Sequence, residues 1–189
     1  MGTSNKQKTI EVVAGAGGAK GPGLIGAFRA LEERGVAIGK ITGVSIGSLV
    51  AAFYANGYGS DELEKLFVED DLPLEIARQF NSLWSWLDPR PLFGLGVLNM
   101  RPAFEQLVQR YDLKPRPNLR IVAFNVVTRK PIVFEGTRYN LAEALTASCA
   151  IPGIMRPVLY FGDSVKQRFV TAQALDRAIA SGRVPVVAA

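Results

Sequence analysis

The first part of the chain alternates between short apolar runs and helical spacings of apolar residues. Residues 9–14 (Thr-Ile-Glu-Val-Val-Ala) are a β-branched run that predicts a strand, and a glycine-rich stretch follows at 15–23. Apolar residues then recur at helical spacing over 24–31, until a glycine ends the pattern. A second apolar run at 41–44 leads at once into another helix-forming run. This repetition predicts an α/β fold with a parallel sheet and crossover helices.

The remainder of the chain predicts further elements and one domain. The predicted elements are a helix with Ser60 as its N-cap, a helix at 102–111, a strand at 119–128 with a hairpin partner at 131–135, a helix at 141–148, strands at 158–161 and 167–170, and a helix at 171–180. Residues 70–117 are otherwise less regular. Their aromatic stretch 84–93 is either a lipid-facing lid or a packed connection. We expect a flexible leader at 1–8 and a single domain over 9–189.

Composition and charge narrow the function classes. Of the 189 residues, 48% are hydrophobic and 21% are charged, an ordinary balance for a globular domain. The net charge is +5, but lysine and arginine are scattered along the chain, so a nucleic-acid partner is not indicated. The absence of histidine removes every Ser-His-Asp triad, every Cys-His pair and most zinc sites. The base of any nucleophile is therefore not an imidazole. We also expect no cofactor and no metal.

A motif of the form Gly43-x-Ser45-x-Gly47 lies where the second strand pattern changes into a helix pattern. This is the sequence form of a nucleophile elbow, a sharp strand-to-helix turn that carries an exposed serine. Glycines on both sides fit a strand and a helix that pass too close for a Cβ atom. The helix N-terminus behind Ser45 also favours negative charge on the serine oxygen. A close-packed turn without chemistry has the same residues, and this alternative stays open.

The glycine-rich stretch after the first strand predicts an oxyanion hole. Consecutive small residues let backbone N–H groups point into one spot, and Gly17 and Gly18 are the natural donors. The alternative is a phosphate-binding loop of the dinucleotide type. That loop needs Gly-x-Gly-x-x-Gly and an acidic residue at the end of a second strand, and the sequence completes neither feature.

Four stretches in this order resemble the patatin-like phospholipase family over about residues 9–170. They are a glycine loop at 16–21 (Ala-Gly-Gly-Ala-Lys-Gly), the elbow at 43–47, a strand pair that begins at Asn125, and the segment 147–153 (Ala-Ser-Cys-Ala-Ile-Pro-Gly). The resemblance implies a three-layer α/β/α fold with a mainly parallel central sheet. It also implies a Ser-Asp dyad that acts on the acyl esters of lipids.

The resemblance extends residue by residue to the expected site. Ser45 corresponds to the nucleophile, with Gly43 and Gly47 as the elbow glycines. The oxyanion and substrate-binding set then consists of Gly17, Gly18, Ala19, Lys20, Gly21 and Ile46, the residue after the nucleophile. Lys20 stands where the family has arginine, which keeps the charge but loses the planar guanidinium.

The expected base is where the sequence departs from the family. The family's aspartate lies in an Asp-Gly-Gly or Asp-Gly-Ala motif after the proline segment, and no Asp-Gly pair occurs in this chain. Three explanations stay open. The chain is a truncated or inactive member, or residues were lost between Val170 and Thr171, or Asp163 or Asp176 substitutes. We take Asp163 as the provisional base, although aspartate after Gly162 is also typical of an ordinary turn.

These observations predict a serine hydrolase of phospholipase A type that cleaves fatty-acyl esters and contacts membranes peripherally. The alternatives are a catalytically impaired lipid-binding protein of the same fold and a thioesterase or carboxylesterase. The polar start of the chain and the lack of a long apolar run predict a cytoplasmic or membrane-peripheral location. Cys149, the single cysteine, is expected to be a buried structural thiol.

Overall fold

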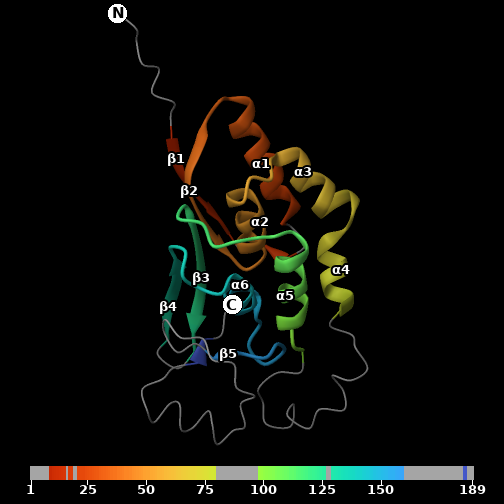
Figure 1. Ribbon diagram of the computed structural model, residues 1–189, viewed down its shortest axis with the longest axis vertical. Coiled ribbons are helices and arrows are strands. Elements are labelled where there is room, and N and C mark those ends of the chain that lie inside the picture. Colours follow the sequence, from red (N-terminus) through yellow and green to blue (C-terminus); the bar gives the residue numbers. More distant parts are fainter. Residues whose placement is uncertain are drawn as a thin grey trace, which may run out of the picture.

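The centre of the fold is a four-stranded sheet with the strand order β1-β2-β3-β4 (Figure 1). The computed structural model describes residues 9–15, 17–18, 21–79, 98–126, 129–159 and 185–186. Strands β1 (Thr9–Ala14), β2 (Ala37–Val44) and β3 (Leu119–Asn125) run parallel, and β4 (Lys130–Glu135) pairs antiparallel with β3. The predicted α/β class with a mainly parallel sheet is confirmed.

Helices connect the parallel strands as crossovers. The helices are α1 (Pro22–Glu33), α2 (Ile46–Ala55), α3 (Ser60–Glu64), the π-helix η2 (Lys65–Glu69), α4 (Leu72–Gln79), α5 (Arg101–Arg110) and α6 (Leu141–Cys149). Strands β5 (Val158–Leu159) and β6 (Pro185–Val186) form a separate antiparallel pair. Helix α1 links β1 to its neighbour β2, and the helices from α2 to α5 link β2 to β3, as expected for neighbouring parallel strands.

One face of the sheet forms the core together with the helices. Ala14, Gly43, Ile121 and Phe134 are register partners across all four strands, and all four are buried. Because successive side chains alternate between the faces of a sheet, Val13 points to the opposite side, where its side chain is 71% exposed. The elements that place Ser45 therefore all pack on the face that carries Ala14 and Gly43.

Helix α2 is the centre of this core. Every residue of α2 from Gly47 to Phe53 is buried. The ring of Phe53 lies edge-on to three other rings, at centroid distances of 5.0 Å from Tyr58, 5.7 Å from Phe67 and 5.1 Å from Tyr111. Such tilted aromatic pairs add to the stabilisation from apolar burial. Helix α2 is thus held along its length, which fixes the turn that precedes it.

Two of the predicted details are wrong. The N-cap of α3 is Gly59 and not Ser60, since the backbone N–H groups of these two residues donate to the carboxylates of Glu62 and Glu32, respectively. The Leu63 N–H, which a serine cap at position 60 would bind, donates instead to the carbonyl oxygen of Gly59 at 3.0 Å. The second detail is α4, an eight-residue helix inside the segment expected to be less regular.

The other predicted elements agree with the structure or lie outside its described part. Each predicted helix up to residue 149 is present, with ends that shift by one or two residues, and the predicted hairpin of β3 and β4 is confirmed. Strand β5 pairs with β6, a segment for which the sequence predicts no strand. The leader 1–8, the aromatic stretch 84–93 and the elements predicted between 167 and 180 lie outside the described residues.

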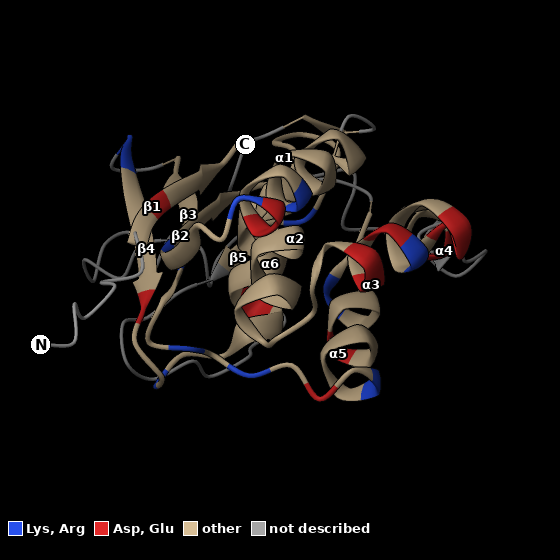
Figure 2. Cartoon of the chain, turned by 90° about the horizontal axis from the view of Figure 1, so that it is seen from above, with Lys and Arg blue, Asp and Glu red and all other residues tan. Residues whose placement is uncertain are grey.

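Charged residues of both signs lie side by side on the helices α3, α4 and α5 (Figure 2). Many are paired: Arg29 bonds Asp61 at 2.9 Å and Glu64 at 2.6 Å, and Arg110 bonds Glu75 at 2.8 Å. Exposed pairs of this kind contribute little to stability. None of the helices that the structure describes combines the length and the apolar character of a membrane span.

One ion pair is largely buried and connects α5 to α6. Arg101 Nη2 lies 2.5 Å from Glu143 Oε1, and the Glu143 side chain is almost fully inaccessible to water. Its second oxygen, Oε2, is buried without a hydrogen-bond partner among the described residues. Burial raises the pKa of Glu143, while the charge and the hydrogen bond of Arg101 lower it. The carboxylate therefore depends on Arg101 to stay ionised.

We expect Arg101→Ala to destabilise the fold by about 3 kcal/mol at pH 8, because it leaves a buried carboxylate without its partner. The substitution raises the pKa of Glu143 further. A folded-state pKa above the unfolded value costs stability as the pH rises through it, so the loss should be smaller at pH 5 than at pH 8. Urea unfolding at both pH values measures this. Glu105→Gln removes only the exposed partner of Arg101 and should change stability by less than about 0.5 kcal/mol. An equal loss for Arg101→Ala at both pH values would contradict the interpretation.

Candidate functional site

Ser45 is the single residue between strand β2 and helix α2. Strand β2 ends at Val44 and α2 begins at Ile46, so a single residue makes the reversal. Its backbone has φ 54° and ψ −130°, a positive-φ conformation that non-glycine residues rarely adopt. Conformations of this kind cost about 1–3 kcal/mol and persist only where the surrounding structure holds them in place. The structure thus has the backbone geometry of the predicted elbow.

Glycine is required at positions 43 and 47 because backbone atoms of other residues lie too close for a Cβ atom. A Cβ at Gly43 would lie 2.3 Å from Cα of Ser48, and a Cβ at Gly47 would lie 2.1 Å from the carbonyl oxygen of Ala14. Both neighbours are backbone atoms, which cannot turn aside as a side chain would. Strand β2, helix α2 and the end of β1 therefore meet without space for a single methyl group.

The glycine loop is held against the elbow at both of its ends. At its start, the carbonyl oxygen of Gly15 would lie 2.5 Å from a Cβ at Gly47. At its end, a Cβ at Gly21 would lie 2.6 Å from Cγ1 of Ile46. The loop thus spans from one residue of the elbow to another. The predicted oxyanion residues Gly21 and Ile46 are in direct contact as a result.

The interior of the loop is a tight turn. Gly18 has φ +51°, and its carbonyl oxygen accepts the N–H of Gly21 at 3.1 Å. Gly21 in turn accepts the N–H of Leu24 at 3.0 Å, which starts α1. Gly17 and Gly18 are exposed in this turn. Ala19 and Lys20, which the sequence analysis places in the same loop, lie outside the described residues.

Two buried serines bind the peptide groups of Ser45. The backbone N–H of Ser45 donates to Oγ of Ser148 at 2.9 Å, and Ser148 Oγ donates to the carbonyl oxygen of Val122 at 2.7 Å. The carbonyl oxygen of Ser45 accepts from Oγ of Ser48 at 2.6 Å. Both serines are completely inaccessible to water. The sequence analysis did not identify these two serines as partners of Ser45. The feature that could have indicated them is a polar residue at a buried position in each alanine-rich helix.

Cys149 lies beside the same contacts but has an unreactive thiol. Its Sγ is 3.9 Å from Oγ of Ser48. Burial raises the pKa of Cys149 to about 12, and the hydrogen bond with Ser48 only partly opposes this. Because the thiolate is the nucleophilic form, a raised pKa disfavours reaction of this thiol at neutral pH. The sequence predicts a buried structural thiol, whereas the structure leaves Cys149 only partly buried at the end of α6.

No carboxylate of the described residues hydrogen-bonds to Ser45, whose partners there are Ser48 and Ser148. The two aspartates considered as bases, Asp163 and Asp176, lie outside the described residues. Of the predicted site residues, the structure therefore brings together those of the elbow and the described ones of the glycine loop.

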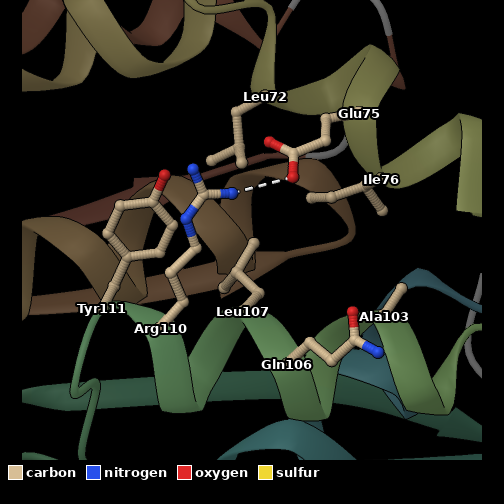
Figure 3. A pocket seen from close by; sticks show the side chains of 8 residues that line it. All are labelled: Leu72, Glu75, Ile76, Ala103, Gln106, Leu107, Arg110 and Tyr111. Atoms are coloured by element: carbon tan, nitrogen blue, oxygen red, sulfur yellow. Dashed lines mark hydrogen bonds and ion pairs between the residues drawn. The ribbon is translucent and has the colours of Figure 1, made fainter.

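A small pocket lies elsewhere in the molecule, between α4 and α5 (Figure 3). Its volume is about 50 Å³, and the ion pair of Arg110 with Glu75 crosses it. Ligand pockets for organic molecules usually measure roughly 300–1,000 Å³. None of the residues that line it belongs to the elbow or the glycine loop, so this pocket is separate from the turn at Ser45.

The sequence matches the model of a known protein family. A sequence model of the family described as patatin-like phospholipase matches residues 12–176, which confirms the resemblance found from the motifs. The protein YqhO of Bacillus subtilis, described as uncharacterized, is 29% identical over 181 residues that cover 79% of this chain and 58% of YqhO. The uncharacterized protein R571 of Acanthamoeba polyphaga mimivirus is 27% identical over 160 residues, 78% of this chain and 53% of R571.

Shorter stretches match larger proteins more closely. The human patatin-like phospholipase domain-containing protein 6 is 51% identical over 124 residues, 64% of this chain and 8% of that protein. The lysophospholipase NTE1 of Candida glabrata is 49% identical over 80 residues, 42% of this chain and 4% of that protein. The chain spans a little over half the length of YqhO and R571 and a small part of these two larger relatives.

Two glycine substitutions, one at the elbow and one in helix α1, should have opposite effects on stability. We expect Gly47→Ala to lower the free energy of unfolding by about 3 kcal/mol, because its methyl group meets backbone oxygens of β1 and the glycine loop. Gly26→Ala is the matched control, since its Cβ enters open space inside helix α1, and it should stabilise the protein by about 0.5–1 kcal/mol. Chemical denaturation of both variants measures the difference. Equal stabilities would contradict the described packing.

The raised pKa of Cys149 predicts that the native protein reacts very slowly with a thiol reagent. At pH 8, roughly one thiol in 10⁴ is ionised if the pKa is about 12. Because the chain has one cysteine, the absorbance change with 5,5′-dithiobis(2-nitrobenzoic acid) reports this residue alone. The native protein should react over hours and the urea-unfolded protein within minutes. Rapid reaction of the native form would show that Cys149 is accessible and ionised.

Proposed function

The chain belongs to the patatin-like phospholipase family, and on this premise we propose that it is a serine acyl hydrolase in which Ser45 attacks the acyl ester of a lipid. The observation that carries the proposal is the backbone of Ser45, which adopts φ 54° at a one-residue turn between β2 and α2. Strained backbone of this kind clusters at catalytic positions.

The oxyanion hole is proposed to consist of backbone N–H groups from two segments. Gly17 and Gly18 supply donors from the glycine loop, and Ile46 supplies the first N–H of helix α2. The contact between Gly21 and Ile46 supports this arrangement, because it holds the loop beside the residue that follows the nucleophile. The first N–H groups of a helix lack partners within the helix, and the helix dipole favours negative charge there. Donors fixed in this way stabilise the tetrahedral intermediate without reorganisation.

The reaction follows from these parts. Ser45 Oγ forms a bond to the acyl carbon as its proton passes to a base, and the alcohol of the lipid leaves with a proton. Water then attacks the acyl-serine, and its proton passes to the same base as Ser45 is regenerated. Since the chain has no histidine, we propose a carboxylate as this base, with Asp163 first and Asp176 second.

The substrate class is proposed from the family and its relatives. A fatty-acyl ester of a glycerophospholipid agrees with the family description, and one of the relatives is called a lysophospholipase. A lysophospholipid is therefore the first natural substrate to test. Peripheral contact with a lipid surface stays a prediction. It is supported by Ile151 and Ile154, whose side chains are 48% and 51% exposed just beyond the end of α6.

A second proposal is an impaired protein that binds lipid esters and reacts with them once. The specific observation in its favour is the absence of any Asp-Gly pair from the sequence. Loss of a general base typically lowers the rate by about 10²–10⁴-fold. In this case Ser45 would still accept an electrophile, while turnover would be very slow.

The proposed function predicts covalent labelling of Ser45 by a fluorophosphonate and hydrolysis of p-nitrophenyl butyrate and of lysophosphatidylcholine. Ser45→Ala should abolish labelling and reduce hydrolysis by at least about 10³-fold. Ser60→Ala is the control, because this serine is buried in α3 away from the elbow and should react as the wild type does.

The outcomes separate the two proposals. Labelling at Ser45 together with turnover supports the hydrolase, and labelling without turnover supports the impaired protein. A wild-type chain that takes up no more probe than Ser45→Ala would overturn both. Greater activity on short-chain esters or thioesters than on the lysophospholipid would replace the lipid substrate by the carboxylesterase or thioesterase alternative.

A further inference from the structure

The parallel pairing of β2 with β3 stops one residue before Ser45. The pairs run from Ile41 to Val44, and the last joins Val44 to Val122. In a parallel ladder, evenly spaced N–H groups of one strand continue to donate to carbonyls of the next strand. The next N–H along β2 belongs to Ser45, and it donates instead to Oγ of Ser148, which itself donates to the carbonyl of Val122. The Ser148 hydroxyl thus takes the place of one rung between the strands.

The Ser148 hydroxyl lets the chain turn away from the sheet at Ser45 without losing the hydrogen bond of the Ser45 N–H. To reach φ 54°, Ser45 must turn away from the sheet, and its N–H then moves out of reach of β3. The position is dry, because Ser148 is completely inaccessible to water. An N–H left without a partner in such a place carries its full desolvation cost. A hydroxyl inserted from α6 bonds both backbone groups and lets Ser45 leave the sheet.

We propose that Ser148 is a positioning residue for Ser45, whose hydroxyl bridges the Ser45 N–H to the Val122 carbonyl and so sets the direction of the Ser45 side chain. The inference rests on the proposed function, because it gives Ser148 a role only if Ser45 is the nucleophile. Ser148 acts through the backbone of Ser45 and not on the substrate. Its proton is engaged with Val122 and its oxygen with Ser45, so it is not the missing base.

Ser48 provides a contrast within the same turn. Its hydroxyl bonds the Ser45 carbonyl oxygen at 2.6 Å, but its backbone N–H donates to the same oxygen at 2.8 Å. Removing the Ser48 hydroxyl leaves that carbonyl with a partner. Removing the Ser148 hydroxyl leaves the Ser45 N–H without its partner. The two serines are equally buried, so the same substitution at each separates the bridge from general loss of packing.

The test measures the rate constant of inactivation and the binding constant of a fluorophosphonate on the full chain. Wild type, Ser148→Ala, Ser148→Thr and Ser48→Ala are compared at a temperature where circular dichroism shows each to be folded. Ser148→Ala should lower the inactivation rate constant by about 10- to 100-fold with an unchanged binding constant, since a misplaced nucleophile reacts slowly but leaves the acyl site intact. Ser148→Thr keeps the hydroxyl and should recover most of the rate. Ser48→Ala should react nearly as the wild type does.

A measurement on the wild-type protein covers the case in which Ser148→Ala does not fold. Hydrogen exchange followed by NMR should show that the Ser45 amide is protected, and free exchange of this amide would overturn the proposal. An unchanged inactivation rate constant in Ser148→Ala would also overturn the proposal. So would equal decreases of this rate constant in Ser148→Ala and Ser48→Ala. If Ser45→Ala takes up as much probe as wild type, the proposed function fails and the role of Ser148 fails with it. A protected Ser45 amide would then show a bridge that serves the fold alone.

Discussion

The distance between strand β2 and helix α2 is the constraint on which the rest of the site depends. The two elements approach until a Cβ at Gly43 would lie 2.3 Å from Cα of Ser48, and only one residue remains to reverse the chain. That residue, Ser45, cannot adopt an ordinary backbone conformation under this restriction. The strain is sustained by the burial of α2, whose Phe53 is packed among three aromatic rings. Binding of α2 into the core thus holds the elbow in its strained form.

The packing of α6 against β3 and α2 also determines the polar contacts inside the core. Helix α6 packs against β3 and α2, and three of its eight buried residues are alanines. Ser148 and Thr146 are hydroxyl-bearing exceptions, and each finds a carbonyl: Ser148 that of Val122, and Thr146 that of Ala142 in its own helix. Only Ser148 is also reached by a backbone N–H from another element, that of Ser45. The position of one hydroxyl in a helix otherwise devoted to packing thus follows from where the sheet ladder ends.

Local patterns predicted most of the fold, and long-range contacts account for what they did not predict. The β-branched run at 9–14 and the helical spacing before Gly35 are local signals, and the structure agrees with both. The role of Ser60 was mistaken because its N–H donates to Glu32, a residue 28 positions away in the sequence, whereas the Gly59 N–H donates to the nearby Glu62.

The same distinction holds for the site. The elbow residues are adjacent in sequence and were found there. The contact of Gly21 with Ile46, and the bridge through Ser148, join residues 25 and 103 positions apart, and no spacing rule reveals them.

The printed contacts of Ser45 and its flanking glycines come from a small set of elements in the described part of the chain. Among the described residues, these contacts come from the end of β1, the glycine loop, α2, β3 and α6. In the proposed hydrolase, these contacts would hold the backbone of Ser45 whichever residue accepts its proton. Attack on a strongly electrophilic phosphonate depends mainly on this geometry, whereas each round of ester hydrolysis also requires a base in two proton transfers. An altered residue at the base would slow the second process far more than the first, because the nucleophile would remain in place.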